Sequence, residues 1–376
     1  MNLSTNEPMN LGTNELIHLD TPNVGELEKE YLCKAVDSTY VSTIGPFVNE
    51  FEDSFARFLG TEKAVGTQSG TAALHMAMVE EKIGPGDEVI VPALTFVATV
   101  NPVMYVGATP VFADVDAATW NISPASIEAA VTPKTKAIIP VHLYGNPCAM
   151  AGIMDIAVRH NLLVIEDATE SAGATYRGRY TGTLGHWGCF SFNGNKILTT
   201  GGGGMIVGSD QQKLNHIKFL VNQARDETKG YYHPEVGYNY RLTNIEAALG
   251  LAQLSRLETF LLKKRRFREI YYNELSNIAE IEFQAMEQDS SSSCWFTAIK
   301  FKERTSAEIQ LKLKEKGVPS RRNFYPITEF APYQPYKRAE LPNTYELFER
   351  GLCLPGSTVN SEENILEVCR IIKQFF

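Results

Sequence analysis

Short apolar runs recur along the chain, separated by longer amphipathic segments, and this alternation is the feature that most limits the possible fold. The runs suit buried strands, and several segments between them have helical length and spacing. Strands that alternate with helices favour an α/β fold, with a mainly parallel sheet covered by helices on both faces. The expected strands are Lys63–Thr67, Glu88–Val91, Pro110–Ala113, Ala137–Val141, Leu162–Glu166, Cys189–Phe192 and Met205–Val207.

The pattern changes after about residue 250. Arg241–Leu275 predicts a pair of helices, and its basic run Lys263–Arg266 is expected on a solvated helix face. Cys294–Phe301 predicts a strand. We therefore expect a large α/β domain over residues 1–250 and a smaller C-terminal α+β domain over residues 251–376.

Charge and composition exclude several classes of partner. Lys and Arg number 35 against 44 Asp and Glu, a net charge of −9, so a nucleic-acid partner is not expected. The most apolar stretch, Val89–Val106, is interrupted by Pro92 and Pro102, so we expect no membrane span. The six cysteines form no CxxC pair or zinc spacing, and no metal site is expected. Without a visible signal peptide, a cytoplasmic location is expected.

Three segments contain residues suited to chemistry, and the first is Gly66–Leu74. A strand ends there, small residues that include Gly70 and Thr71 turn the chain, and a helix begins. Backbone N–H groups at a helix N-terminus bind anions, although an ordinary helix cap would give the same pattern. Neither the P-loop nor the dinucleotide-binding motif is present.

The second and third segments supply an acid and an amine. Val164–Glu170 ends a strand in acidic residues, including Asp167, at the edge where α/β sheets bind ligands. A helix-capping role for Asp167 is the alternative. Phe190–Lys196 ends in a lysine and is followed by Gly201–Gly204. A lysine amine forms a Schiff base with a carbonyl cofactor, although a single lysine is usually a surface charge.

An anion cradle, a strand-end acid and a lysine are the groups that pyridoxal 5'-phosphate (PLP) requires for its phosphate, ring nitrogen and aldehyde. At this point the sequence resembles the DegT/DnrJ/EryC1/StrS sugar aminotransferases, which are fold-type-I PLP enzymes. The resemblance is carried by Ser69–Leu74, Pro92–Thr99, Pro140–Gly145, Glu166–Ala168, Ser191–Lys196 and Gly237–Arg241.

The resemblance implies a role for each matching residue. Lys196 corresponds to the Schiff-base lysine that shuttles a proton, and Asp167 to the partner of the ring nitrogen. Phe96 corresponds to the aromatic residue stacked on the cofactor ring. The positions that bind the phosphate are Gly70, Thr71, Ala72 and Ser191, together with Asn239 from the neighbouring subunit. A homodimer with shared active sites is therefore expected.

Glu170 departs from the pattern, because many members have Gln or His three residues after the Asp. This acid resembles a subgroup that acts at C4 of UDP-linked 4-keto-6-deoxy-N-acetylglucosamine, in the bacillosamine and legionaminic acid pathways. Glu170 is expected to contact the cofactor's phenolic oxygen, either when protonated or through water.

Substrate contacts are expected from residues outside the cofactor motifs. Arg321, Arg322 and Tyr325 lie where family members often place substrate-facing residues, and an arginine suits a UDP diphosphate. His142 lies at a strand end in a family motif. It is expected either to approach the substrate or to be a hydrogen-bonded structural histidine.

The implied reaction moves the amino group of L-glutamate to the UDP-linked keto sugar and releases 2-oxoglutarate. One alternative is an aminotransferase acting at C3 of a dTDP- or UDP-linked keto sugar. A second is a PLP-dependent sugar dehydratase, which in this family has histidine in place of the lysine, so Lys196 argues against it. A third is a non-catalytic module that binds PLP or a sugar.

Overall fold

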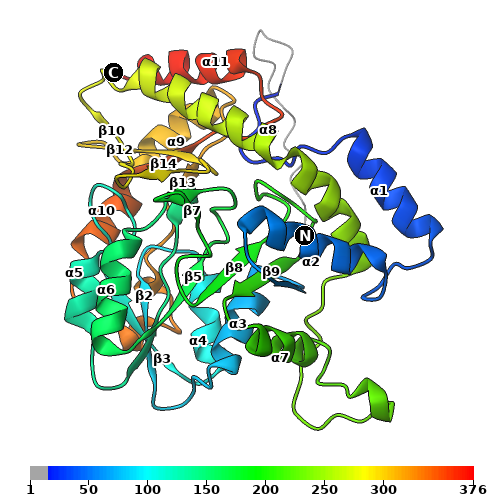
Figure 1. Ribbon diagram of the computed structural model, residues 1–376. Coiled ribbons are helices and arrows are strands. Elements are labelled where there is room, and N and C mark those ends of the chain that lie inside the picture. Colours follow the sequence, from blue (N-terminus) through cyan, green and yellow to red (C-terminus); the bar gives the residue numbers. More distant parts are fainter. Residues whose placement is uncertain (1–15) are drawn as a thin grey trace.

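The computed structural model describes residues 16–376 (Figure 1). Residues 1–15, which hold nearly all of the segment in which no signal peptide is expected, lie outside the described part. All the expected large-domain strands form one seven-stranded sheet in the order β1-β9-β8-β5-β4-β2-β3. They are β1 (Ala64–Thr67), β2 (Glu88–Pro92), β3 (Thr109–Ala113), β4 (Thr135–Ile138), β5 (Leu163–Asp167), β8 (Trp187–Ser191) and β9 (Gly204–Gly208).

The sheet is mostly parallel, as expected. Strand β2 pairs in parallel with β3 and β4, β4 with β5, and β5 with β8, whereas β9 runs antiparallel to both of its neighbours. The carboxyl ends of β2, β4, β5 and β8 therefore meet at one edge. Ligands of open α/β sheets bind at such an edge.

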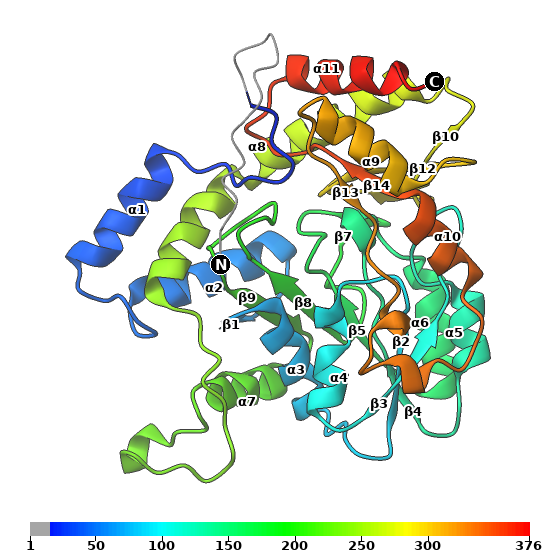
Figure 2. The same cartoon turned by 180° about the vertical axis from the view of Figure 1, so that it is seen from behind.

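Helices cover both faces of this sheet (Figures 1 and 2). Val89 and Val91 of β2 pack in one core with residues of α3 and α7, whereas Ile90 packs with residues of α5 and α6. This alternation follows from the two-residue period of a strand, and burial on both faces explains why the strands are continuous apolar runs. The helices are α2 (Pro46–Leu59), α3 (Gly70–Glu80), α4 (Asn101–Tyr105), α5 (Pro124–Ala130), α6 (Met150–His160) and α7 (Gln211–Val221).

The C-terminal part of the chain has a separate core around an antiparallel sheet, in the order β10-β12-β14-β13. Its elements are α8 (Asn244–Leu275), β10 (Ile281–Phe283), β12 (Thr297–Phe301), α9 (Ser306–Glu315), β13 (Arg321–Arg322), α10 (Pro342–Arg350), β14 (Gly351–Leu354) and α11 (Glu362–Lys373). The remaining helix and strands are α1 (Glu26–Asp37), β6 (Thr175–Tyr176), β7 (Arg179–Tyr180) and β11 (Ser290–Ser291). The domain boundary at residue 250 stays a proposal, because α8 crosses it.

Two expectations for the region after residue 240 are wrong. The expected helix pair is one helix of 32 residues, α8. Gly250 lies inside it, where a Cβ would lie 2.6 Å from the Phe51 ring, so this glycine permits close helix packing and does not end the helix. The basic run is not wholly solvated, because Lys264 is buried and its Nζ donates to the carbonyl oxygens of Trp295 (3.0 Å) and Gly356 (2.7 Å).

No helix within residues 16–376 combines the length and apolar character needed to cross a membrane.

Candidate active site

A cavity of about 380 Å³ lies at the carboxyl edge of the large sheet, and we call it the site cavity. The residues that line it follow the carboxyl ends of five strands of this sheet and are joined by residues of the C-terminal domain. The lining includes Gly70, Thr71, Phe96, Asp167, Glu170, Ser191, Lys196 and Arg321, all of which the sequence indicated. Residues from Gly70 to Lys196 meet here because parallel strands end at a common edge, and Arg321 joins them from the C-terminal domain.

Asp167 ends β5, and its carboxylate is held by neutral hydrogen-bond donors. Its Oδ1 accepts from the Thr169 hydroxyl at 2.6 Å and from the Thr169 backbone N–H at 3.1 Å. Its Oδ2 accepts from the Thr99 hydroxyl at 2.7 Å. The side chain is buried yet lines the site cavity. A buried carboxylate with satisfied hydrogen bonds is a suitable partner for a cationic ring nitrogen.

Lys196 and Glu170 both line the cavity and face each other, with Nζ and Oε1 3.9 Å apart. Burial lowers the pKa of the Lys196 amine, and the Glu170 carboxylate opposes this shift. Burial also raises the pKa of Glu170, opposed chiefly by the charge on Lys196. The second oxygen of Glu170 accepts from the Tyr144 backbone N–H at 2.8 Å. Desolvation therefore favours a neutral amine, which is the nucleophilic and proton-accepting form of lysine.

The expected anion cradle is built from the N-terminus of α3 and the strand ends beside it. Ser69 caps the helix by accepting from the Ala72 N–H at 3.1 Å, so the Ala72 amide is engaged within the protein. Gly70 and Thr71 line the cavity, whereas Ala72 does not. A Cβ on Gly204 would lie 2.5 Å from the Ser69 carbonyl carbon, so this glycine lets β9 approach the helix terminus. Gly70, Thr71 and Ser191 therefore line a place suited to a phosphate, whereas Ala72 does not reach it.

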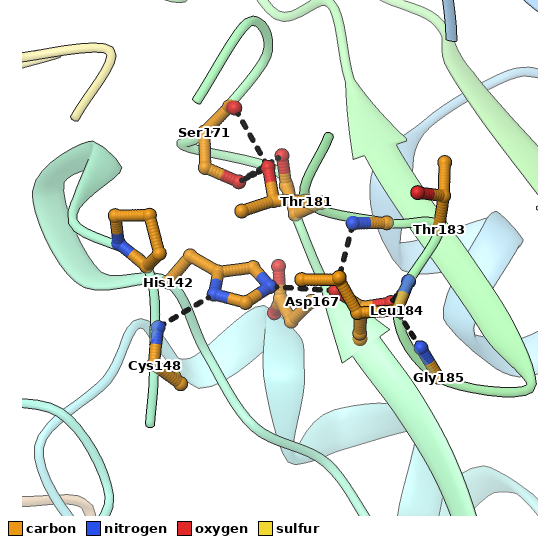
Figure 3. A network of polar contacts seen from close by, with 12 residues as sticks. His142, Cys148, Asp167, Ser171, Thr181, Thr183, Leu184 and Gly185 are labelled. Carbon is orange, nitrogen blue, oxygen red and sulfur yellow. Dashed lines mark hydrogen bonds and ion pairs between the residues drawn. The ribbon is translucent and has the colours of Figure 1, made fainter. Parts of the chain in front are cut away.

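His142 lies outside the site-cavity lining, in a buried network of polar contacts (Figure 3). Its Nδ1 accepts from the Cys148 N–H at 3.0 Å, so the ring hydrogen is assigned to Nε2, which donates to Glu166 at 2.9 Å. Both ring nitrogens are thus engaged within the protein. These contacts favour the structural alternative for His142 over a substrate contact.

Glu166 gathers four hydrogen bonds in this network, since its carboxylate also accepts from the backbone N–H groups of Gly182, Leu184 and Gly185 at 2.6–2.8 Å. The side chain is fully buried. The Glu166 carboxylate therefore ties the chain around Gly182–Gly185 to the end of β5, next to Asp167.

Replacing Glu166 with Gln is expected to lower the free energy of unfolding by about 3–5 kcal/mol, measured by urea denaturation. Either orientation of the amide would place its NH₂ group against N–H donors. The matched control is Glu128→Gln, because Glu128 also binds a histidine, His160, at 2.9 Å but is exposed. Its loss should stay under about 1 kcal/mol. If the two variants lost equal free energy of unfolding, burial of the Glu166 carboxylate would not explain the effect.

The three expected substrate residues of the C-terminal domain separate in the structure. Arg321 and Arg322 are adjacent in β13, so their side chains point to opposite sides. Arg321 lines the site cavity, whereas Arg322 donates to Ser306 and to the Phe348 carbonyl. Tyr325 lines a different hollow and packs on Phe348. Of the three, only Arg321 is placed to meet a ligand in the site cavity.

The Arg321 guanidinium lies over the rings of Trp295, Phe296 and Phe324, with its Cζ 4.4–5.3 Å from their centroids. Its Nε and Nη2 are buried without a hydrogen-bond partner among residues 16–376. Unpaired buried donors are costly, and an anionic group of a ligand would satisfy them.

Asn239 does not reach the site cavity of its own chain. It is exposed, in the segment between α7 and α8, where it forms a β-bridge with Asn222. This placement leaves the expected contact with a neighbouring subunit open, and that role stays a prediction.

Several residues of the site were missed by sequence reasoning. The Trp295 ring lies 3.9 Å from the Lys196 Nζ, and its indole N–H donates to the Asn195 carbonyl oxygen at 2.8 Å. Phe324, which the sequence placed among the substrate-facing residues of the C-terminal domain, does join the lining, 5.8 Å from the Phe96 ring. Trp295 lies within the expected strand Cys294–Phe301, for which the sequence predicted no role in the site. Thr99 was quoted only as part of a family motif.

These groups fit PLP: Lys196 for covalent attachment, Asp167 for the ring nitrogen and the α3 terminus for the phosphate. Together with the α/β sheet, they define a fold-type-I PLP-dependent aminotransferase. Residues 22–373 match the DegT/DnrJ/EryC1/StrS aminotransferase family, and the chain belongs to that family.

The relatives agree with this assignment over nearly the whole chain. GDP-perosamine synthase of Caulobacter vibrioides is 41% identical over 357 residues, covering 94% of this chain and 96% of the relative. UDP-N-acetyl-3-dehydro-alpha-D-glucosamine 3-aminotransferase of Acidithiobacillus ferrooxidans is 37% identical over 326 residues, covering 86% and 87%. This protein is therefore a PLP-dependent sugar aminotransferase.

Solved structures give the same fold. The aminotransferase from Psychrobacter cryohalolentis superposes with a TM-score of 0.90 at 31% identity, covering 96% of this chain and 98% of that one. The PLP form of Spr1654 from Streptococcus pneumoniae superposes with a TM-score of 0.91 at 26% identity, with the same coverage.

Proposed function

We propose that this aminotransferase transfers the amino group of L-glutamate to the C4 keto group of a UDP-linked 4-keto-6-deoxy-N-acetylhexosamine. The products are 2-oxoglutarate and a UDP-4-amino-4,6-dideoxy sugar. The observation that carries the proposal is Glu170, which stands where many family members have Gln or His and faces Lys196 at 3.9 Å. The same acid is what the sequence shares with the subgroup that acts on this sugar.

The residues of the site divide the work. Bound PLP supplies an electron sink that stabilises negative charge on the reacting carbon. Lys196 takes up and returns the proton at its Nζ, for which its lowered pKa is suited. The Asp167 carboxylate carries the negative charge that stabilises the protonated ring nitrogen. Arg321 binds an anionic group of the substrate, consistent with its unpaired Nε and Nη2.

A second candidate substrate is a GDP-linked keto sugar. GDP-perosamine synthases of Caulobacter vibrioides, Escherichia coli and Vibrio cholerae are 41%, 38% and 34% identical to this chain. The UDP-linked relative from Acidithiobacillus ferrooxidans is 37% identical, so identity does not separate the two nucleotides. The name of that relative is that of a 3-aminotransferase, so transfer of the amino group to C3 of the sugar stays an alternative to transfer to C4.

The experiment is a panel of three keto sugars, each incubated with the enzyme, PLP and L-glutamate. They are UDP-4-keto-6-deoxy-N-acetylglucosamine, the GDP-linked keto sugar that corresponds to GDP-perosamine, and UDP-N-acetyl-3-dehydro-glucosamine. We expect kcat/KM to be highest for the first, with the new amine at C4 by NMR. A higher value for either other sugar would replace the proposed substrate, and no turnover with any of the three would contradict the proposed substrate.

We also propose that the enzyme works as a homodimer with shared sites. A groove of about 830 Å³ lies between the start of α2 and the segment before α8, and its lining includes the exposed Tyr40 and Ile44. Arg241 also lines it, and its Nε is buried without a partner in the described chain. Asn239, two residues before Arg241, faces outward. A second copy over this groove would cover the apolar surface and place Asn239 near the neighbour's cofactor phosphate.

Mixing two impaired variants tests the shared site. Lys196→Ala and Asn239→Ala homodimers should each be impaired, the second only partly. In a mixed dimer one site then carries both defects and the other carries none. Random exchange makes about half of the dimers mixed, so restored activity should approach roughly one quarter of wild type. Recovery no greater than the average of the parents, with exchange verified by mass spectrometry, would exclude the shared site.

A further inference from the structure

A chain of buried hydroxyl groups leads to the Asp167 carboxylate. The Thr99 hydroxyl lies 2.7 Å from Asp167 Oδ2, and the Thr95 hydroxyl lies 2.8 Å from that of Thr99. The side chains are nearly inaccessible, with exposed fractions of 1% for Thr95 and 2% for both Thr99 and Asp167. All three residues line the site cavity.

Which hydroxyl group donates in each of these hydrogen bonds follows from the number of hydrogens that each group carries. The carboxylate only accepts, so the single hydroxyl hydrogen of Thr99 is committed to Asp167. Thr95 must then donate to Thr99. Hydrogen bonds in such a series polarise one another, so the Thr95 bond strengthens the bond from Thr99 to the carboxylate.

The arrangement separates the two oxygens of Asp167. Thr169, two residues along the chain, supplies both donors to Oδ1 through its own N–H and hydroxyl. Only Thr99 among the described residues donates to Oδ2, and it comes from the segment between β2 and α4. Thr99 therefore fixes the rotation of the carboxylate from outside the turn that contains Asp167.

We propose that Thr99, oriented by Thr95, is a positioning residue that holds the Asp167 carboxylate ionised and aimed at the ring nitrogen of the cofactor. This proposal rests on the proposed function, in which Asp167 is the partner of that nitrogen. Because Thr99 acts through Asp167, its contribution exists only when the ligand has a nitrogen at that position.

The test compares PLP with its 1-deaza analogue, in which the ring nitrogen is replaced by C–H. The dissociation constant of each ligand is measured with the full-length apoprotein of wild type and variants. Thr99→Val preserves the shape of the side chain and removes the hydroxyl. We expect it to weaken PLP binding by about 10-fold, because a hydrogen bond to a charged group is lost. Binding of the deaza analogue should change by less than about 2-fold.

Three further variants sharpen the result. Thr99→Ser keeps the hydroxyl and should restore most of the affinity for PLP. Thr95→Val should show the same ligand dependence with a smaller loss, about 2- to 3-fold, since it acts one bond further away. Thr344→Val is the matched control, because the Thr344 hydroxyl is buried and donates to Asp114 Oδ1 at 2.7 Å, outside the site-cavity lining. It should change neither dissociation constant.

Equal weakening of PLP and deaza-PLP by Thr99→Val, or no weakening of either, would overturn the proposal. Asp167→Asn in the same assay separates this failure from that of the proposed function. If Asp167→Asn discriminates between the two ligands and Thr99→Val does not, only the role of Thr99 is wrong. If Asp167→Asn does not discriminate, Asp167 is not the partner of the ring nitrogen and both proposals fall.

Discussion

Replacing Lys196 with Ala is expected to reduce turnover by about 10³-fold or more and to abolish covalent attachment of the cofactor. Lys196 is the one lysine among the residues that line the site cavity within the described chain. In the proposed mechanism its side chain supplies both the amine for attachment and the group that moves the proton. No neighbouring group replaces both, because Glu170 is an acid and the Arg321 guanidinium stays protonated.

The attachment is measured by borohydride reduction of the wild-type enzyme, followed by proteolysis and mass spectrometry. The cofactor mass should appear on the peptide that contains Lys196. Lys264 is the internal control, because burial also lowers the pKa of its amine, to about 8, but two backbone carbonyl groups hold it outside the site-cavity lining. A label on Lys264, or activity in Lys196→Ala near the wild-type value, would contradict the assignment.

Replacing Asp167 with Asn is expected to lower kcat by about 10²- to 10³-fold, since a buried charged partner is worth roughly 2–5 kcal/mol. The change preserves the size of the side chain and removes its negative charge, which weakens the stabilisation of a protonated ring nitrogen. The rate of the half-reaction with L-glutamate, measured by stopped flow, should fall by the same factor.

Asp114→Asn is the control for the loss of a buried carboxylate. Asp114 also accepts from a threonine hydroxyl, that of Thr344, but it lies outside the site-cavity lining. We expect this variant to lose stability and to retain the kcat of wild type in its folded fraction. An Asp167→Asn enzyme within about twofold of wild type would show that the negative charge is not used.

The sequence predicted the sheet and the acids and bases at its edge for the same physical reason. Strands buried on both faces must be apolar, so the first polar residues after them, such as Asp167, stand out at the strand ends. Lys196 follows β8 within a few residues. Local sequence is therefore enough to place these groups on the edge where ligands bind.

Contacts between distant segments were not predictable in the same way. Trp295 meets Lys196 because the turn before β12 packs onto the large domain, and no periodic pattern encodes that approach. The separation of Arg321 from Arg322 depends on β13, which is only two residues long and gives no alternating signal. The burial of Lys264 was missed because a run of four basic residues suggests solvent exposure, whereas two carbonyl groups accept its hydrogens.

The unbroken helix α8 limits the motions by which one site can admit two different substrates in turn. It begins beside the large sheet and continues into the core of the C-terminal domain, without proline and with its Gly250 braced by the Phe51 ring. Sharp helix bends need such breaks, so hinge rotation about this connection is disfavoured. Access of two different substrates to the same cavity would then depend on lining side chains that also reach solvent, such as Phe96, which is 55% exposed.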